Sequence, residues 1–149
     1  MTIPQITIRK GSILEATTVT HQIPEFGKTY MTAEYVKRLE DTLHLILIAE
    51  IEGKIVGFKV GYDREHDGSF YSWMGGVLPA HRRKGVASLL TARFEQWALL
   101  KGYKSVRFKT RNEFKGMLVF SLNRGFKIVD FDARKSLDQH RVILEKKLG

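Results

Sequence analysis

One stretch of sequence organises this chain: Val77-Leu78-Pro79-Ala80-His81-Arg82-Arg83-Lys84-Gly85-Val86-Ala87. Upstream of it, residues 70–77 are aromatic and β-branched, which predicts a strand. Downstream, apolar side chains recur at helical spacing and predict a helix that runs to about Leu100. The members of this apolar stripe are Val86, Leu89, Leu90, Phe94 and Trp97. A basic turn with a glycine therefore joins the end of a strand to the start of a helix.

The start of that helix predicts an anion site. The first N–H groups of a helix have no partner inside it, and the helix dipole is positive there. Three adjacent cations, residues 82–84, add charge, and Gly85 lets the backbone approach a phosphate without a Cβ in the way. The pattern suits a pyrophosphate. The alternative interpretation is a solvated basic loop before an ordinary helix.

The spacing of these residues resembles a known motif. Arg82, Gly85 and Ala87 form Arg-x-x-Gly-x-Ala after Val77-x-Pro79, which resembles the acetyl-CoA-binding motif of the GNAT N-acetyltransferase family. The resemblance implies that acetyl-CoA is the co-substrate. It also implies that the strand end binds the pantetheine arm, and that an N–H there polarises the thioester carbonyl. The coenzyme-binding residues that it implies are Val77, Leu78, Arg82, Arg83, Lys84, Gly85, Val86, Ala87, Ser88 and Asn112.

Composition predicts a cytoplasmic protein of one domain, residues 1–149, with no membrane partner. The chain has 43% hydrophobic and 28% charged residues and no cysteine, so a disulfide framework and a thiolate nucleophile are excluded. No apolar run approaches the roughly 20 residues that span a bilayer. The five histidines lack paired metal-ligand spacing, so no metal is expected.

The order of predicted elements defines the fold class. A strand at residues 5–9 comes first, followed by two helices, of which Ser12 is predicted to cap the first. Then come strands over residues 43–52, 54–62 and 70–77, the central helix, a strand at 105–109, a helix opened by Asn112, and strands from 126 and at 140–146. This order predicts an α/β fold: a mixed, mostly antiparallel twisted sheet of about seven strands with helices on both faces. It also matches the topology of the GNAT family from end to end. Gly125-Phe126 closes the last helix as it does in the family.

The family's reaction, implied here by resemblance, moves an acetyl group directly from the thioester to a primary amine of a small molecule or peptide. Many members carry a tyrosine acid four residues before Gly-Phe, where this chain has Ser121. Ser121 is therefore the candidate acid, with a helix-surface serine as the alternative interpretation. Glu25 is the candidate base, because the family's acceptor side is covered by that loop; an exposed loop carboxylate is its alternative. Tyr30, Tyr35 and Trp73 are candidates for the acceptor pocket or for the core.

Charge keeps other functions open. Residues 1–74 hold eight Lys and Arg against ten Asp and Glu, whereas residues 75–149 hold seventeen against six. The basic half suits coenzyme phosphates and also motivates a less favoured nucleic-acid-binding module, around Lys104, Arg107, Lys109 and Arg111. The acidic half suggests a cationic acceptor. A protein that binds acyl-CoA without turnover is a third possibility, and a homodimer is possible by family resemblance.

Overall fold

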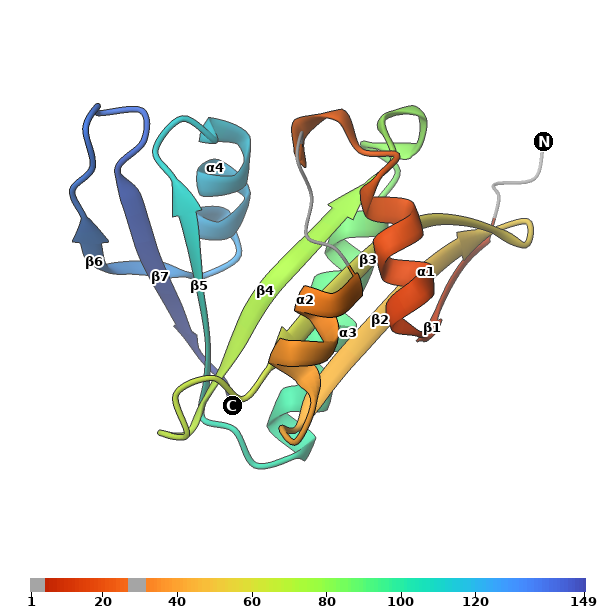
Figure 1. Cartoon of the computed structure of the whole chain (residues 1–149), viewed down its shortest axis with the longest axis horizontal. Helices are drawn as coiled ribbons and strands as arrows, with labels where there is room; N and C mark the ends of the chain where they lie inside the picture. The colour runs from red at the N-terminus through yellow and green to blue at the C-terminus, as the bar shows by residue number, and fades with distance from the viewer. Residues whose placement is uncertain (1–4, 27–31) are drawn as a thin grey trace.

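One seven-stranded sheet runs through the computed structural model, which describes residues 5–26 and 32–149. Its strand order is β1-β2-β3-β4-β5-β7-β6 (Figure 1). The strands are β1 (Ile6–Lys10), β2 (His44–Ile51), β3 (Lys54–Tyr62), β4 (Ser69–Val77), β5 (Ser105–Arg111), β6 (Lys127–Asp132) and β7 (Arg141–Lys147). The helices are α1 (Ile13–Thr20), α2 (Thr32–Leu39), α3 (Val86–Leu100) and α4 (Lys115–Asn123), with short 3₁₀ helices at Pro24–Phe26 and Pro79–His81.

The predicted order of elements and the mixed sheet are confirmed. Every neighbouring pair of strands is antiparallel except β4 and β5, which run parallel. A parallel pair needs a crossover connection, and α3 supplies it. The hairpin between β2 and β3 turns at Glu52 and Gly53, both with positive φ. The crossover therefore falls at the stretch that organises the sequence.

Helices cover the two faces of the sheet unequally. On one face α3 buries Val86, Leu90 and Phe94 against the sheet, and Leu118 of α4 packs against the same core. On the other face α1 and α2 cover β2, β3 and β4 through a second core that includes Tyr35 and Leu39. Figure 1 shows α1 and α2 in front of the sheet and α3 behind it. No helix of the described residues covers the face of β5 and β7 on the side of α1 and α2.

Two predicted helix starts have different outcomes. Ser12 caps α1 in a reciprocal capping box, with Glu15 N donating to Ser12 Oγ at 3.1 Å and Ser12 N donating to Glu15 Oε1 at 3.0 Å. Asn112, in contrast, does not open α4, which begins at Lys115 after the N-cap residue Phe114. The prediction for Asn112 as a cap was wrong because its N–H donates to His140 O and its side-chain Nδ2 donates to Leu137 O. Asn112 thus belongs to the turn beside β7.

Candidate active site

The strands β4 and β5 pair over three positions and then separate. The parallel bridges join Ser69, Phe70 and Tyr71 to residues 105–107. A bulge then gives β4 one extra residue, Trp73, opposite Val60 and Gly61 of β3, and a bulge bends the strand that carries it. Figure 1 shows β4 and β5 diverging from there toward the start of α3. We call the closed end of this gap, at Tyr71 and Arg107, the apex.

The edge of β4 that faces the gap offers backbone groups. Leu78 N donates to Val56 O of the neighbouring β3 at 2.8 Å. Because peptide groups alternate sides along a strand, the N–H groups of Val77 and Gly75 face the gap instead. Arg82 Nε donates to Val77 O at 3.0 Å from that side. The N–H of Leu78 is thus used inside the sheet, and the donor nearest the motif that faces the gap belongs to Val77.

The start of α3 leaves its first N–H groups without a side-chain cap. Gly85 is the N-cap residue with φ +87°, a backbone conformation that favours glycine, and no heavy atom lies within 4 Å of the position of a Cβ. Leu89 N donates to Gly85 O as the first helical bond. The N–H groups that precede it belong to Val86, Ala87 and Ser88. Exposed Arg83 and Lys84 lie beside them, so the site has the composition of an anion cradle.

Arg82 is committed to another partner. Its guanidinium binds both carboxylate oxygens of Glu25 at 2.5 and 2.9 Å, which ties the 3₁₀ helix Pro24–Phe26 to the turn before α3. These hydrogen bonds hold the pKa of the Glu25 carboxyl below its usual value. A carboxylate with a lowered pKa, and with both oxygens occupied, is a poor proton acceptor. The geometry therefore favours Glu25 as a structural partner of Arg82 rather than as the base.

Ser121 is buried, not on the helix surface. The residue is 3% exposed, and its hydroxyl donates to Met117 Sδ at 3.7 Å within α4. The interpretation as a surface serine was therefore wrong, because this side of α4 packs inward. A hydroxyl turned toward its own helix is also poorly placed to donate a proton into the gap, so the structure does not support Ser121 as the acid.

A lysine that the sequence analysis missed lies near the apex. Lys59 of β3 extends on the α3 side of the sheet, and its Nζ donates to Ser72 Oγ at 3.0 Å. Ser72 is the first residue of β4 beyond the bridges to β5. The Lys59 Nζ also lies 4.9 Å from the centre of the Phe94 ring. Burial lowers the pKa of Lys59 to about 8, with Glu95 opposing this shift and Arg124 adding to it.

The surroundings of Lys59 contain further charged groups. Glu95 Oε1 accepts a hydrogen bond from Lys146 Nζ at 2.7 Å, whereas buried Glu95 Oε2 and Arg124 Nε find no partner among the described residues. Buried polar atoms are seldom left unsatisfied in proteins. One signal in the sequence could have indicated this place: Lys59 stands between Gly57 and Gly61 in an apolar strand. These glycines let α3 approach closely, since a Cβ at position 61 would lie 2.3 Å from the Phe94 ring.

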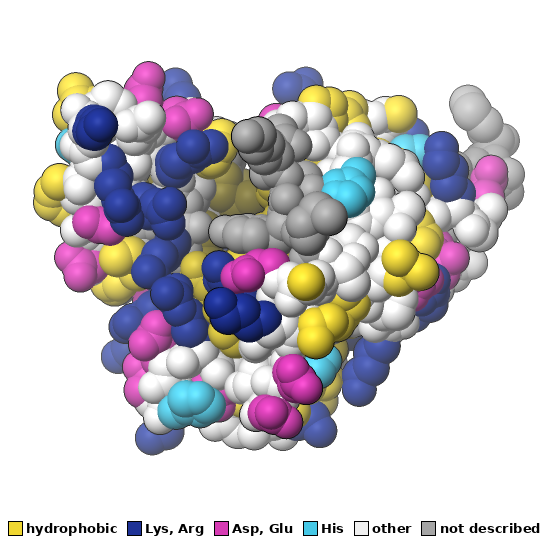
Figure 2. Space-filling model, in the orientation of Figure 1, with side chains coloured by type: hydrophobic (Ala, Val, Ile, Leu, Met, Phe, Trp, Pro, Cys, Tyr) yellow, Lys and Arg dark blue, Asp and Glu magenta, His cyan; other side chains and the backbone are white. Residues whose placement is uncertain are grey.

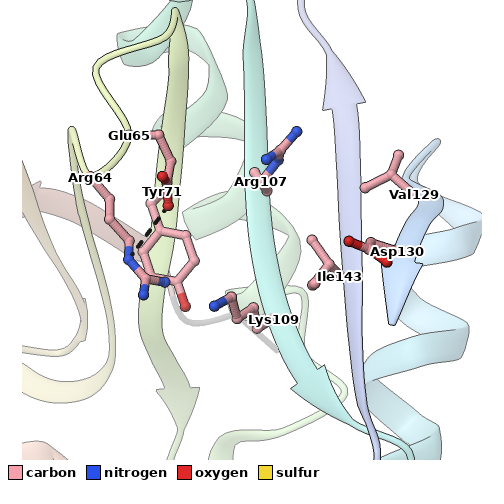
Figure 3. Close-up of a pocket in the computed structure, with 8 residues that line it drawn as sticks. All are labelled: Arg64, Glu65, Tyr71, Arg107, Lys109, Val129, Asp130 and Ile143. Carbon is pink, nitrogen blue, oxygen red and sulfur yellow. Dashed lines mark ion pairs between the residues drawn. The ribbon is translucent and has the colours of Figure 1, made fainter. Parts of the chain in front are cut away.

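A pocket opens at the apex on the opposite face of the sheet. It encloses about 300 Å³ between β4, β5, β6 and β7 (Figure 3). Its lining residues are Arg64, Glu65, Tyr71, Arg107, Lys109, Val129, Asp130 and Ile143. Two of the cations proposed from the sequence as a nucleic-acid surface therefore line a confined pocket.

Two of the three aromatic candidates for an acceptor pocket, Tyr35 and Trp73, are described by the structure and contact each other. Tyr35 is fully buried, with its ring 4.7 Å from that of half-buried Trp73, so it belongs to the core. Trp73 occupies the bulge of β4 next to the apex. Tyr30 lies outside the described residues. Across residues 5–26 and 32–149, no group of three His, Asp or Glu side chains could hold a metal ion.

Comparison with protein families identifies the motif. The model of the acetyltransferase (GNAT) family matches residues 14–126. A protein named acetyltransferase from Pectobacterium atrosepticum is 32% identical over 77 residues, which cover 52% of this chain and 53% of that protein. The chain thus spans about half the length of the curated relatives it matches.

Comparison with solved structures supports the fold. Ard1 from Thermoplasma volcanium superposes with a TM-score of 0.81 at 20% identity, over 97% of this chain and 98% of that one. The PaiA N-acetyltransferase from Thermoplasma acidophilum, solved in complex with coenzyme A, gives 0.74 at 20% identity, over 96% and 99%. At such identities the likeness establishes the shared fold.

Proposed function

Because this chain belongs to the acetyltransferase (GNAT) family, we propose that it moves an acetyl group from acetyl-CoA directly to a primary amine, without a covalent enzyme intermediate. The observation that carries the proposal is the uncapped start of α3 beside the gap between β4 and β5. The start of α3 supplies N–H donors for the pyrophosphate of coenzyme A, and the edge of β4 along the gap supplies backbone groups for its extended pantetheine arm. From Val77 to the apex that edge is about 20 Å long.

The chain's own residues fit such a ligand. The N–H groups of Val86, Ala87 and Ser88 bind the pyrophosphate, and Arg83 and Lys84 add positive charge. Along β4 the N–H groups of Val77 and Gly75 bind the pantetheine arm. Arg82 acts indirectly, since it holds the turn through Glu25 and Val77 O. Asn112 has no assigned contact with the coenzyme in this proposal, since its N–H and its side chain are hydrogen-bonded to His140 O and Leu137 O.

Acetyl-CoA supplies the activated acyl group, and the protein must supply a proton for the departing sulfur. We assign that role to Lys59, through Ser72 or directly. In the transfer a C–N bond forms and the C–S bond breaks, the amine loses a proton and the sulfur gains one. The pKa of Lys59, lowered to about 8 by burial, is close to the ordinary thiol value of roughly 8.5, which favours proton transfer between them.

Titration calorimetry of acetyl-CoA with wild type, Gly85→Glu and Gly102→Glu tests the binding site. Both glycines have positive φ and no heavy atom within 4 Å of a Cβ, but they lie at opposite ends of α3. The backbone strain of the two substitutions is therefore matched. We expect micromolar binding to wild type and to Gly102→Glu, and a loss of at least 100-fold in Gly85→Glu. No binding to wild type, or equal loss in both variants, would contradict the proposal.

Two other functions make different predictions. A protein that binds acyl-CoA without turnover would bind it tightly and acetylate no amine in a broad panel. A nucleic-acid-binding module would bind oligonucleotides with a steep salt dependence. The pairing of Arg107 with Glu145 at 3.0 Å weakens the basic surface that this second function needs.

The proposal also covers the oligomeric state of the protein and its cellular compartment. Sedimentation tests a homodimer, for which the exposed apolar side chains of β6, at Ile128, Val129 and Phe131, offer a surface. No described helix has the length and apolar character needed to cross a membrane. We propose a cytoplasmic location from the absence of cysteine.

A further inference from the structure

The pocket at the apex has an unusual charge for a site that receives an amine. It lies on the face of β5 and β7 that no described helix covers, and Lys and Arg side chains form a column over that part of the molecule (Figure 2). Figure 3 shows Arg64 and Tyr71 on one side of the pocket and Arg107 and Lys109 on the other. The lining holds three cations, Arg64, Arg107 and Lys109, against two carboxylates, Glu65 and Asp130, so its net charge is positive and disfavours an amine that carries no anion.

The cations of the pocket differ in how they are engaged. Arg107 pairs with Glu145, its NH2 lying 3.0 Å from the carboxylate. Arg64 contacts Glu65 at 3.6 Å and lies 4.9 Å from the centre of the Tyr71 ring. Lys109 makes no ion pair or side-chain hydrogen bond with the rest of the described chain. It is therefore the cation available to a ligand.

The electrostatic surroundings of Lys109 also favour the binding of an anion. Burial lowers the pKa of Lys109, and the charges of Arg64 and Arg141 lower it further, against the opposing effects of Glu65 and Asp132. Positive charge is thus in excess around its ammonium group. The pocket carboxylate of Asp130 accepts a hydrogen bond from the N–H of Phe131 at 2.8 Å. A ligand anion would relieve the excess and gain a charge-assisted hydrogen bond.

The position of Lys109 relates this anion to the reaction. Arg107 is bridged to Tyr71 at the apex, and Lys109 follows it on the same face of β5, about 7 Å further along the strand. A molecule whose amine enters the gap beside Tyr71 therefore presents its next chemical groups to Lys109. This distance matches a carboxylate one residue along a peptide from its reacting N-terminal amine, whereas the carboxylates of a free amino acid lie closer to its amine.

We propose that the acceptor is a primary amine that also carries a carboxylate, and that Lys109 binds this carboxylate. The inference rests on the proposed acetyl transfer and specifies its substrate class. It replaces the cationic acceptor suggested by the acidic N-terminal half of the sequence. The carboxylate belongs either to a free amino acid or to an acidic residue near a peptide N-terminus.

Acceptors that differ only in charge test the proposal. Short amidated peptides that begin Ala-Asp, Ala-Asn and Ala-Lys, together with free aspartate and spermidine, are assayed with acetyl-CoA. We expect the Ala-Asp peptide or free aspartate to exceed the neutral and cationic acceptors at least tenfold in kcat/KM. The comparison of these two identifies the source of the carboxylate. A preference for the Ala-Lys peptide or for spermidine would overturn the inference.

The variant Lys109→Met tests the contribution of the Lys109 charge to acceptor binding. Its KM for the acidic acceptor should rise about tenfold, the effect of losing one charge-assisted contact, whereas kcat and the affinity for acetyl-CoA stay unchanged. Lys104→Met is the matched control, because Lys104 is also exposed but lies just before β5 and outside the pocket. Equal KM values in wild type and Lys109→Met would reject the role of Lys109.

A binding experiment separates this inference from the proposed function. N-acetylated Ala-Asp amide, the product, is titrated into the protein saturated with coenzyme A. Binding that weakens about tenfold in Lys109→Met supports the carboxylate site even where no acceptor is turned over, an outcome that would count against the transferase alone. No product binding, or displacement of the product by an oligonucleotide, would overturn the carboxylate site while acetyl-CoA binding still stands.

Discussion

The two arms of this molecule are built differently. We call β1–β4 with α1, α2 and α3 the N-terminal arm, and β5, β7 and β6 with α4 the C-terminal arm. Helices cover both faces of the N-terminal arm, and apolar β2 is buried along residues 45–49. In the C-terminal arm α4 covers one face, and all six residues of β6 are exposed. One arm is a core with two packed faces, while the other offers a charged face to a ligand.

The difference explains where the proposed site lies. The arms share one sheet, yet they are joined by bridges at only three positions of β4 and β5. The N-terminal arm contributes the start of α3, the edge of β4 and Lys59. The C-terminal arm contributes Arg107 and Lys109. We infer that the gap binds ligands because the strands stop pairing there, which leaves backbone donors that the sheet would otherwise use.

The largest expected effect contrasts the same substitution in the two arms. Gly61→Ala places a Cβ 2.3 Å from the Phe94 ring and 2.7 Å from Tyr71 O. The packed N-terminal arm cannot absorb it easily, so we expect the free energy of unfolding to fall by about 3 kcal/mol. Gly116→Ala in α4 meets nothing within 4 Å and should raise it by about 0.5 kcal/mol. Urea denaturation measures the free energy of unfolding of both variants. Equal changes in the two would contradict the difference in packing between the arms.

The next effect concerns Lys59, the lysine of the N-terminal arm whose Nζ donates to Ser72 beside the gap. Lys59→Met keeps the length of the side chain and removes the proton donor, so kcat should fall on the order of 100-fold with an unchanged affinity for acetyl-CoA. The acid acts in its protonated form. Wild-type kcat should therefore decline as the pH rises through about 8, the value to which burial lowers the pKa of Lys59. This decline should be absent in the variant.

Lys54→Met is the control for that experiment, because Lys54 is an exposed residue of the same strand. Its kcat and its pH profile should match those of wild type. A Lys59→Met variant that retains the alkaline decline would assign the ionisation to another group and remove Lys59 from the mechanism.

The smallest expected effect tests the role first predicted for Glu25. Glu25→Gln removes the charge of the partner of Arg82 but leaves an amide that still accepts a hydrogen bond. We expect kcat to change by less than about threefold, since loss of a general base costs roughly 100-fold or more. Steady-state kinetics decides the point: a large fall in kcat, rescued by raising the pH, would restore Glu25 as the base.

Much of the fold could be predicted from local patterns. The strand that ends near Val77, the glycine turn at Gly85 and the apolar stripe of α3 are all periodic or conformational signals within about 25 residues of each other. Ser12 was predicted as a cap by the same kind of local signal. The prediction that Asn112 caps α4 failed because its side chain donates to Leu137 O, 25 residues away. A partner so distant in the sequence cannot be inferred from spacing.

The sequence by itself determined the family, the order of the elements and the turn at Gly85 that begins α3, because these depend on neighbouring residues and on the backbone conformation of one glycine. Only the tertiary structure decided which side chains meet at the apex. It paired Glu25 with Arg82 across 57 residues, turned Ser121 inward, placed Lys59 beside Ser72 and gathered Lys109 with Arg64. The positions of Lys59 and Lys109 depend on strand register, and that of Lys59 relative to Ser72 also on the bulge in β4, since a shift of one residue reverses the face that a side chain occupies.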